Sequence, residues 1–288
     1  MELSVIVVNW NTRSLLLDCL RSIFDQTKGI SYEVWVVDNA STDDSVLEVK
    51  RLKQKIKNLF LIENKKNLGF AQANNQAIKQ ANGDFVLLLN SDTKLIGNAL
   101  EKMINFARKN SRLGILGPRL LNRDKTFQPS VAPFYFLANT FLSLFGGDRF
   151  LRSSPLIAKK VDWVSGSCFL IRKQVIDKTG GLDENFFMYL EEMEFCYRAQ
   201  KAGFQTWFYP GASVYHLVRG SSPAGRQQVI WWTYKSFIYF YQKHFAPWQL
   251  IMLKWLLRLK ALAGWFWGAI TGNPELKITY EKAFRLVR

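Results

Sequence analysis

The chain has 288 residues, of which 48% are hydrophobic and 15% aromatic, and 39 Lys and Arg stand against 23 Asp and Glu for a net charge of +16. This apolar content excludes intrinsic disorder and is enough for one large core, or one domain with an appendage. The three cysteines, Cys19, Cys168 and Cys196, are odd in number and far apart, which argues against a disulfide framework or a cysteine zinc site and favours a reducing compartment.

Short apolar runs alternate with amphipathic stretches in the first part of the chain. Strands that alternate with helices form βαβ units, so the pattern predicts an α/β fold with a mostly parallel sheet. Such sheets bind ligands beyond the carboxyl ends of their strands. The predicted strands are residues 3–8, 33–37, 59–62 and 85–89, and the predicted helices are 12–24, 43–57, 71–80 and 99–109.

The regular pattern stops in residues 119–160, which contain three prolines and Gly146-Gly147. A long irregular excursion is expected there. Further on, the pattern predicts regular structure at 161–172, a helix at 191–201, a strand at 206–209 and aromatic helices after 226. We therefore expect a catalytic domain in residues 1–225 and a separate helical region in 226–288.

Three of the predicted strands run directly into polar residues. Helix caps and turns explain such residues without any further function. That explanation is weaker for Asp38 and Asp92, because each follows an apolar strand at the edge where an α/β sheet receives ligands. The first strand is not followed by a G-x-G-x-x-G loop and no Walker motif is present, which argues against a nicotinamide dehydrogenase or a P-loop ATPase.

Five stretches, in this order, resemble the motifs of family 2 glycosyltransferases, and most of all those of the bacterial rhamnosyltransferase-like branch. They are Val5 to Asn11, Val36 to Asp43, Asn67 to Ala71, Leu87 to Asp92 and Gly180 to Glu194. The resemblance implies a GT-A fold, a nucleoside diphosphate sugar donor, a divalent cation and inversion at the anomeric carbon. It also implies a nucleotide-sugar half at about 1–118 and an acceptor half at about 160–225.

The resemblance assigns the donor side of the site to residues at the strand ends. Asp38 would contact the base or ribose, and Asn9 and Asn11 would line the same nucleotide site. Further donor contacts are implied for Asn67, Gly69, Asn90, Asp92 and Arg219.

A metal site is implied where Asn90-Ser91-Asp92 replaces the D-x-D motif of the family. The first carboxylate is missing, so ligation would rest on Asp92. One carboxylate with phosphate oxygens and water suits Mg²⁺ or Mn²⁺, and the alternative for Asp92 is a helix cap. His216 precedes Arg219-Gly220-Ser221 and would complete the metal or diphosphate site, with a structural histidine as the alternative.

Glu191, Glu192 and Glu194 crowd the start of a predicted helix. The helix dipole alone favours acids there, but mutual repulsion can also raise the pKa of one of them into the range of a useful base. The resemblance assigns the base to Glu192, with Glu191 in reserve.

The acceptor side is implied to include a segment rich in small residues, which lets the backbone approach a sugar closely. The resemblance assigns Trp163, Gly166 and Ser167 to it.

The C-terminal region holds half of the excess charge. Residues 226–288 carry ten Lys and Arg against two Glu, and six of the ten tryptophans. The apolar stretch 248–272 is interrupted by Lys254, Arg258 and Lys260, and each cation costs about 2.5–3.5 kcal/mol at a bilayer centre. We therefore expect an amphipathic helix on an anionic membrane surface, with docking on the catalytic domain or a homodimer through the C-terminal helices as alternatives.

These observations together predict an inverting, metal-dependent glycosyltransferase, cytoplasmic and peripheral on the inner face of the cell membrane. Its donor is expected to be dTDP-rhamnose or a UDP-sugar, and its acceptor a polyprenyl-linked or cell-surface saccharide. Two alternatives stay open. One is a basic protein that binds nucleic acid or another anionic polymer, although no nucleic-acid-binding motif is visible. The other is a sugar-binding pseudoenzyme, suggested by the incomplete D-x-D and by the Glu in the position of the base.

Overall fold

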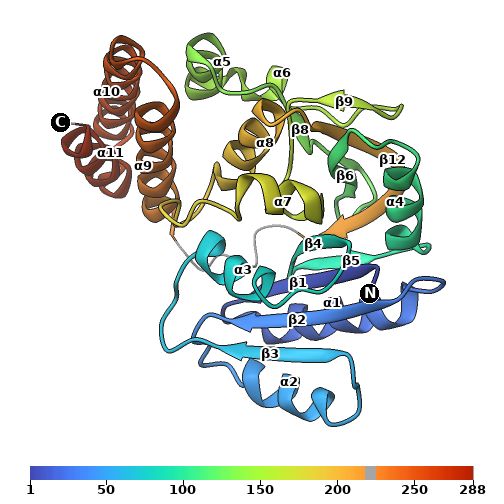
Figure 1. The fold of residues 1–288 in the computed structure, drawn as a ribbon. Helices are drawn as coiled ribbons and strands as arrows, with labels where there is room; N and C mark the ends of the chain where they lie inside the picture. The colour runs from blue at the N-terminus through green and yellow to red at the C-terminus, as the bar shows by residue number, and fades with distance from the viewer. Residues whose placement is uncertain (218–224, 288) are drawn as a thin grey trace.

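The computed structural model describes residues 1–217 and 225–287. Figure 1 shows an α/β body with a group of helices at one side. The strands are β1 (Leu3–Asn9), β2 (Tyr32–Asp38), β3 (Leu59–Glu63), β4 (Phe85–Asn90), β5 (Thr93–Leu95), β6 (Leu113–Leu121), β7 (Phe127–Gln128), β8 (Val131–Ala132), β9 (Lys159–Val161), β10 (Trp163–Val164), β11 (Cys168–Arg172) and β12 (Gln205–His216). The helices are α1 (Arg13–Gln26), α2 (Ser45–Lys53), α3 (Phe70–Ile78), α4 (Ala99–Arg108), α5 (Leu137–Leu142), η1 (Ser143–Gly147), α6 (Asp148–Leu151), α7 (Lys173–Thr179), α8 (Glu191–Lys201), α9 (Arg226–His244), α10 (Pro247–Ile270) and α11 (Pro274–Leu286).

The central sheet confirms the predicted α/β class. Its strand order is β3-β2-β1-β4-β11-β6-β12-β5, and the first four strands are parallel, as the βαβ pattern predicts. β11 runs antiparallel to both β4 and β6, so the second half of the sheet is mixed. The register sets Asn9 opposite Asp38, which brings the polar ends of β1 and β2 together at one edge.

β6 is a long buried strand that the sequence pattern did not predict. It contains Gly114, Gly117 and Pro118, residue types that normally interrupt strands. Here glycine is needed for packing, because a Cβ on Gly117 would lie 2.6 Å from the Cβ of Val164. The excursion predicted for 119–160 contains only short elements, from β7 to α6.

The helices after residue 225 pack on the α/β body through a continuous core. Phe240 and Tyr241 of α9 are fully buried in the same cluster as Phe195 of α8. The Tyr241 hydroxyl donates a hydrogen bond to the carbonyl of Tyr135 at 2.9 Å. In Figure 1, α9 lies nearest to the body, with α10 and α11 beyond it.

None of the described C-terminal helices is a candidate membrane span. Across residues 1–217 and 225–287, none of the helices combines the length and the apolar character that crossing a membrane requires.

Candidate active site

The ends of β1 and β2 are joined by a buried hydrogen-bond network around Asp38. Asn9 donates from Nδ2 to Asp38 Oδ1 at 2.9 Å and to the Ser41 hydroxyl at 3.0 Å. The backbone N–H of Ser41 donates to Asp38 Oδ2 at 2.8 Å. Asn9 is fully buried and its Oδ1 accepts from Thr12 at 2.6 Å. Asn9 therefore holds the Asp38 side chain in place. The Asp38 carboxylate keeps lone pairs that can accept further hydrogen bonds.

The neighbouring loops form a rigid rim beside Asp38. Asn11 has a φ of 54° and accepts a hydrogen bond at Oδ1 from the backbone N–H of Thr42 at 2.7 Å. Asn67 accepts at Oδ1 from the backbone N–H of Gly69 at 2.9 Å. Gly69 has a φ of 83°, and a Cβ there would lie 2.4 Å from the carbonyl oxygen of Phe187. Only glycine fits this close approach between the donor-side loop and the segment that leads into α8.

Asp92 and His216 meet at the far end of β4. The register of β5 and β12 pairs Thr93 with His216, which sets the imidazole beside the preceding aspartate. His216 Nε2 lies 3.4 Å from Asp92 Oδ1. Asp92 is 1% exposed, and neither of its carboxylate oxygens has a hydrogen-bond partner among residues 1–217 and 225–287. A buried carboxylate without partners is costly, so this site has unused capacity to bind a cation.

Gln128 orients the imidazole of His216. Its Oε1 lies 2.7 Å from His216 Nδ1, and its Nε2 donates to Asn122 Oδ1 at 3.1 Å. Since an amide oxygen only accepts, the proton of a neutral imidazole sits on Nδ1 and leaves the lone pair of Nε2 directed to the Asp92 side. Sequence reasoning missed Gln128, because it lies in the irregular excursion and belongs to no motif.

The chemistry of these donors fits a divalent cation whose remaining ligands come from a substrate. The protein offers one carboxylate and one imidazole, ligand types that suit Mn²⁺ and Mg²⁺ sites completed by phosphate oxygens. Among the described residues, no group of three or more His, Cys, Asp or Glu side chains forms a complete protein cage. Arg219, the predicted phosphate partner, lies outside the described residues.

The segment predicted to be on the acceptor side, residues 163–167, lies between the end of β4 and the start of α8. The backbone N–H of Asn90 donates to the carbonyl of Ser167 at 3.0 Å. A Cβ on Gly166 would lie 3.5 Å from Glu192 Cβ, so the glycine backbone lies directly against that side chain. Trp163 is buried beneath this segment, with its Nε1 donating to the Pro133 carbonyl at 2.9 Å.

Glu191 and Glu192 are a closely coupled acid pair at the start of α8. Burial raises the pKa of Glu191 well above its usual range, and repulsion from Glu192 adds to the effect. Burial also raises the pKa of Glu192, against the opposing effects of backbone hydrogen bonds and the charge of Arg152. One carboxylate oxygen of each residue is buried without a hydrogen-bond partner. Both raised pKa values make this pair a better proton acceptor than ordinary glutamates are.

The backbone before this pair is strained. Tyr189 has a φ of 70° and Leu190 a φ of 67°. Left-handed conformations cost free energy for residues with a Cβ and cluster at functional sites. The two residues turn the chain into α8, so that its first two glutamates face the Gly166 segment.

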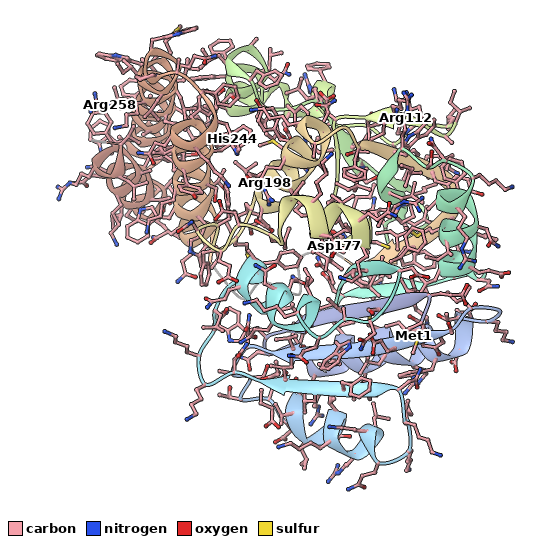
Figure 2. All side chains as sticks on the ribbon, in the orientation of Figure 1. Met1, Arg112, Asp177, Arg198, His244 and Arg258 are labelled. Carbon is pink, nitrogen blue, oxygen red and sulfur yellow. The ribbon has the colours of Figure 1, made fainter. Side chains whose placement is uncertain are left out.

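Glu194 differs from its two neighbours because basic side chains of the protein surround its carboxylate. Arg198 lies 2.8 Å from Glu194 Oε1, and Lys243 and His244 of α9 approach the same oxygen at 2.8 and 3.0 Å. Burial alone would raise the pKa of Glu194, but hydrogen bonds from His244 and Lys243 and the charge of Arg198 lower it. Figure 2 shows Arg198 on α8 and His244 on α9 between the helical group and the α/β body. This glutamate is a structural link and is not part of the acid pair.

Arg152 is a second residue that sequence reasoning missed. It follows α6 in the excursion, its Nε lies 3.2 Å from Asp148 Oδ2, and its guanidinium lies over the Trp163 ring at 5.2 Å from the centroid. From there its charge acts on Glu192. A basic residue in a proline- and glycine-rich stretch gives no sequence signal that separates it from other surface cations.

Comparisons with known proteins identify the family of the chain. The sequence model of "Glycosyl transferase family 2" matches residues 4–180. The chain is 27% identical to an N-acetylglucosaminyl-diphospho-decaprenol L-rhamnosyltransferase of Mycobacterium tuberculosis, over 78% of this chain and 79% of that protein. It is 29% identical to the low-salt glycan biosynthesis hexosyltransferase Agl10 of Haloferax volcanii, over 69% of this chain and 62% of the relative.

A solved structure supports the fold. The mannosyltransferase PcManGT from Pyrobaculum calidifontis, in complex with GDP-Man and Mn²⁺, aligns with a TM-score of 0.60 and 18% identity. The alignment covers 98% of this chain and 73% of that one. The likeness confirms the predicted GT-A architecture. Glu192 and His216 lie beyond the stretch that the family model matches, so their roles depend on the geometry described above.

Proposed function

Because the chain belongs to glycosyl transferase family 2, we propose that it transfers a sugar from a nucleoside diphosphate sugar, dTDP-rhamnose or a UDP-sugar, to a hydroxyl of a lipid-linked saccharide. The rhamnosyltransferase-like relatives support this choice of donor and acceptor. The observation that carries the proposal is that two different acids lie around the end of β4, because Asp92 directly follows this strand and Glu192 lies against Gly166, next to the Ser167 carbonyl that Asn90 bonds. Among the described residues Asp92 accepts no hydrogen bond and has the His216 imidazole 3.4 Å from Oδ1, and Glu192 is a carboxyl of raised pKa.

The donor is held at the ends of β1, β2 and β4 in this proposal. Asp38 accepts hydrogen bonds from the base or ribose, and Asn9 keeps its carboxylate in place. Asn11, Asn67, Gly69 and Asn90 form the surrounding rim. Arg219, outside the described residues, is proposed to pair with the diphosphate.

Asp92 and His216 would hold a divalent cation, Mg²⁺ or Mn²⁺, through one carboxylate oxygen and Nε2. When bound, such an ion neutralises the charge that builds on the departing diphosphate. The burial of Asp92 supports this assignment over a helix cap, because a cap accepts hydrogen bonds from backbone N–H groups and Asp92 accepts none from the part of the chain that the structure describes.

Glu192 acts as the base in this proposal. It removes the proton of the acceptor hydroxyl, whose oxygen then bonds to the anomeric carbon while the bond from that carbon to the diphosphate oxygen breaks on the opposite face. Glu192 is more accessible than Glu191, which is 5% exposed, and it lies against Gly166 of the acceptor segment. Burial keeps the pKa of Glu192 raised. Trp163 and Ser167 support the segment that the acceptor would contact.

The test is the release of nucleoside diphosphate from a panel of donors, with a polyprenyl diphosphate N-acetylglucosamine as acceptor and Mn²⁺ or Mg²⁺ present. Glu192→Gln should reduce transfer ~10²–10⁴-fold, the usual contribution of a general base, while donor binding stays unchanged. The exposed Glu275→Gln on α11 is the matched control and should transfer normally.

Three results would overturn the proposal in different ways. Full transfer by Glu192→Gln removes the assignment of the base. Donor binding without turnover by the parent protein indicates a sugar-binding pseudoenzyme. Salt-sensitive binding to DNA without any donor binding indicates an anionic-polymer binding protein.

A further inference from the structure

The outer face of α10 is apolar along its whole length. Trp248, Met252, Trp255, Leu259, Leu262, Phe266 and Ile270 recur at steps of three or four residues, so they form one stripe on a helix with 3.6 residues per turn. All of them, and the adjacent Ile251, are 49–64% exposed. We call these eight residues the apolar stripe. An exposed apolar face of this length on a protein marks an interaction surface.

The opposite face of α10 already has a partner. Leu253, Leu257, Ala261, Gly264 and Gly268 are its buried residues. A Cβ on Gly264 would lie 2.3 Å from the ring of Tyr280, so α11 packs tightly on this side. The apolar stripe is therefore not the core side of the helix, and the described residues of the chain leave it uncovered.

A second group of exposed apolar side chains lies beside the stripe. Phe141, Leu142, Phe145, Phe150, Leu156 and Ile157 of the excursion are 41–76% exposed. We call them the loop patch. α10 contacts α5 and η1, and Lys260 Nζ lies 5.9 Å from the centroid of the Phe145 ring. In Figure 1, α5 stands next to α10 at the top of the view. Two segments far apart in the sequence thus form neighbouring parts of one surface.

The charges that α10 contributes to this surface are all positive, whereas α6 contributes both Arg149 and Asp148. α10 contains Lys254, Arg258 and Lys260 and neither Asp nor Glu. At 100° per residue, Lys254 and Arg258 lie on one flank of the apolar stripe and Lys260 on the other. Figure 2 places Arg258 at the outer side of the helical group. The exposed Arg149 adds a cation beside Phe150, with 4.7 Å between its guanidinium and the ring centroid.

We propose that the apolar stripe and the loop patch together form a docking surface for an anionic phospholipid membrane. Apolar side chains with Trp enter the interface between headgroups and acyl chains, while the flanking cations reach the phosphates. The charge pattern selects this occupant over a second copy of the chain. Two copies that met through the stripe would bring the flanking cations of both helices together with no acid on either α10 to neutralise them.

This surface also adjoins the candidate active site. The loop patch includes Phe150 of α6, and Arg152, whose charge acts on Glu192, follows the same helix directly. A lipid-linked acceptor in the membrane would then lie on the side of the molecule where the excursion, with Arg152, approaches Glu192. This consequence rests on the proposed function, whereas the docking surface itself does not.

The experiment measures co-sedimentation of the full chain with vesicles, either of phosphatidylcholine alone or of phosphatidylcholine with a third phosphatidylglycerol. We expect binding to the anionic vesicles that weakens at high salt. Trp255→Glu with Leu259→Glu should weaken it at least ~10-fold, and so should Phe150→Glu with Leu156→Glu, because charged groups in the interface oppose burial. Leu47→Glu on α2 is the matched control, since Leu47 is 47% exposed at the other end of the molecule.

Each outcome decides the inference. Loss of binding in both double variants, with circular dichroism and donor binding unchanged, supports one composite surface. Loss in the α10 variant alone overturns the contribution of the loop patch. A parent protein that ignores anionic vesicles and is dimeric in light scattering, but monomeric as Trp255→Glu with Leu259→Glu, overturns the membrane in favour of a second copy. Donor binding is measured separately, so failure of the docking surface is distinct from failure of the enzyme assignment.

Discussion

Gln128 Oε1 and His216 Nδ1 are 2.7 Å apart. This contact decides which nitrogen carries the proton when the imidazole is neutral. Without it, both tautomers of the imidazole are open. With it, the lone pair of Nε2 is available on the Asp92 side. A residue that belongs to no motif therefore prepares one of the two protein ligands of the proposed cation.

Removal of this contact should weaken cation binding. We expect Gln128→Leu to lower the affinity for Mn²⁺ ~10–100-fold in the presence of nucleoside diphosphate, as is typical for the partner of a metal-binding histidine. Gln128→Glu keeps an acceptor opposite Nδ1 and should retain most of the affinity. The measurement is the signal of free Mn²⁺ in electron paramagnetic resonance.

The control for this experiment is Gln54→Leu, an exposed glutamine at the end of α2. It should bind Mn²⁺ like the parent. Equal affinities of Gln128→Leu and the parent would show that the tautomer of His216 plays no part in cation binding.

Asp92→Asn should separate cation binding from folding. The carboxylate is 1% exposed and accepts no hydrogen bond, so its neutral amide should fold at least as stably without a cation. Mn²⁺ with nucleoside diphosphate should raise the Tm of the parent, because a ligand of the native state stabilises it, and should leave the Tm of Asp92→Asn unchanged. Scanning calorimetry gives both values.

Asp124→Asn, in an exposed turn, is the matched control and should respond to Mn²⁺ like the parent. If Asp92→Asn also gains Tm from Mn²⁺, the cation binds elsewhere.

Glu191 should make the stability of the protein fall as pH rises. Its pKa is raised in the folded state by burial and by Glu192. Above about pH 4.3 the unfolded chain loses this proton while the folded protein keeps it, so the free energy of unfolding decreases with pH until the folded pKa is reached. Glu191→Gln removes this penalty, and its advantage over the parent in urea unfolding should grow as the pH rises above about 4.3.

The same pair of unfolding curves for Glu275→Gln, an exposed glutamate of α11, should keep a constant separation from the parent over this range. A constant separation for Glu191→Gln as well would mean that Glu191 is not protonated in the folded protein at neutral pH.

Lys243 should hold α9 against α8. Its Nζ lies 2.6 Å from Asp183 Oδ2 and 2.8 Å from Glu194 Oε1, and the Glu194 side chain is fully buried. Lys243→Met keeps the aliphatic stem and leaves Glu194 with one cation fewer. We expect a loss of ~1–3 kcal/mol in the free energy of unfolding, the usual range for hydrogen bonds to charged groups.

Lys235→Met, exposed on the same helix, should change the free energy of unfolding by less than ~0.5 kcal/mol. If the two variants unfold alike in urea, the ion-pair network does not anchor α9.

Local sequence patterns were enough for the elements of the first half of the chain. β1 to β4 and α1 to α4 lie where apolar periodicity predicts them, within a few residues at each end. β6 was missed because Gly114, Gly117 and Pro118 interrupt its pattern, although the glycines are there for close packing. The same limit applies throughout residues 119–160, where short elements leave no periodic signal.

The candidate site, like the fold, was only partly predictable from the sequence. Strand-end position and motif resemblance led to Asp38, Asp92 and Glu192 from the sequence alone. The separation of Glu194 from Glu191 and Glu192 needed the fold, because the difference arises from Lys243 and His244 on a helix distant in sequence. Repulsion among all three glutamates, the expectation from their spacing, applies only to the first two.

The sequence by itself determined the α/β class, the family and the basic, Trp-rich character of the C-terminal region, because each is written in local periodicity, motif or composition. Tertiary structure decided which groups meet: His216 with Asp92, Gln128 with His216, and Phe145 of the loop patch with Lys260 of α10. Such contacts depend on strand register and helix packing between distant segments. The local sequence pattern does not predict these contacts.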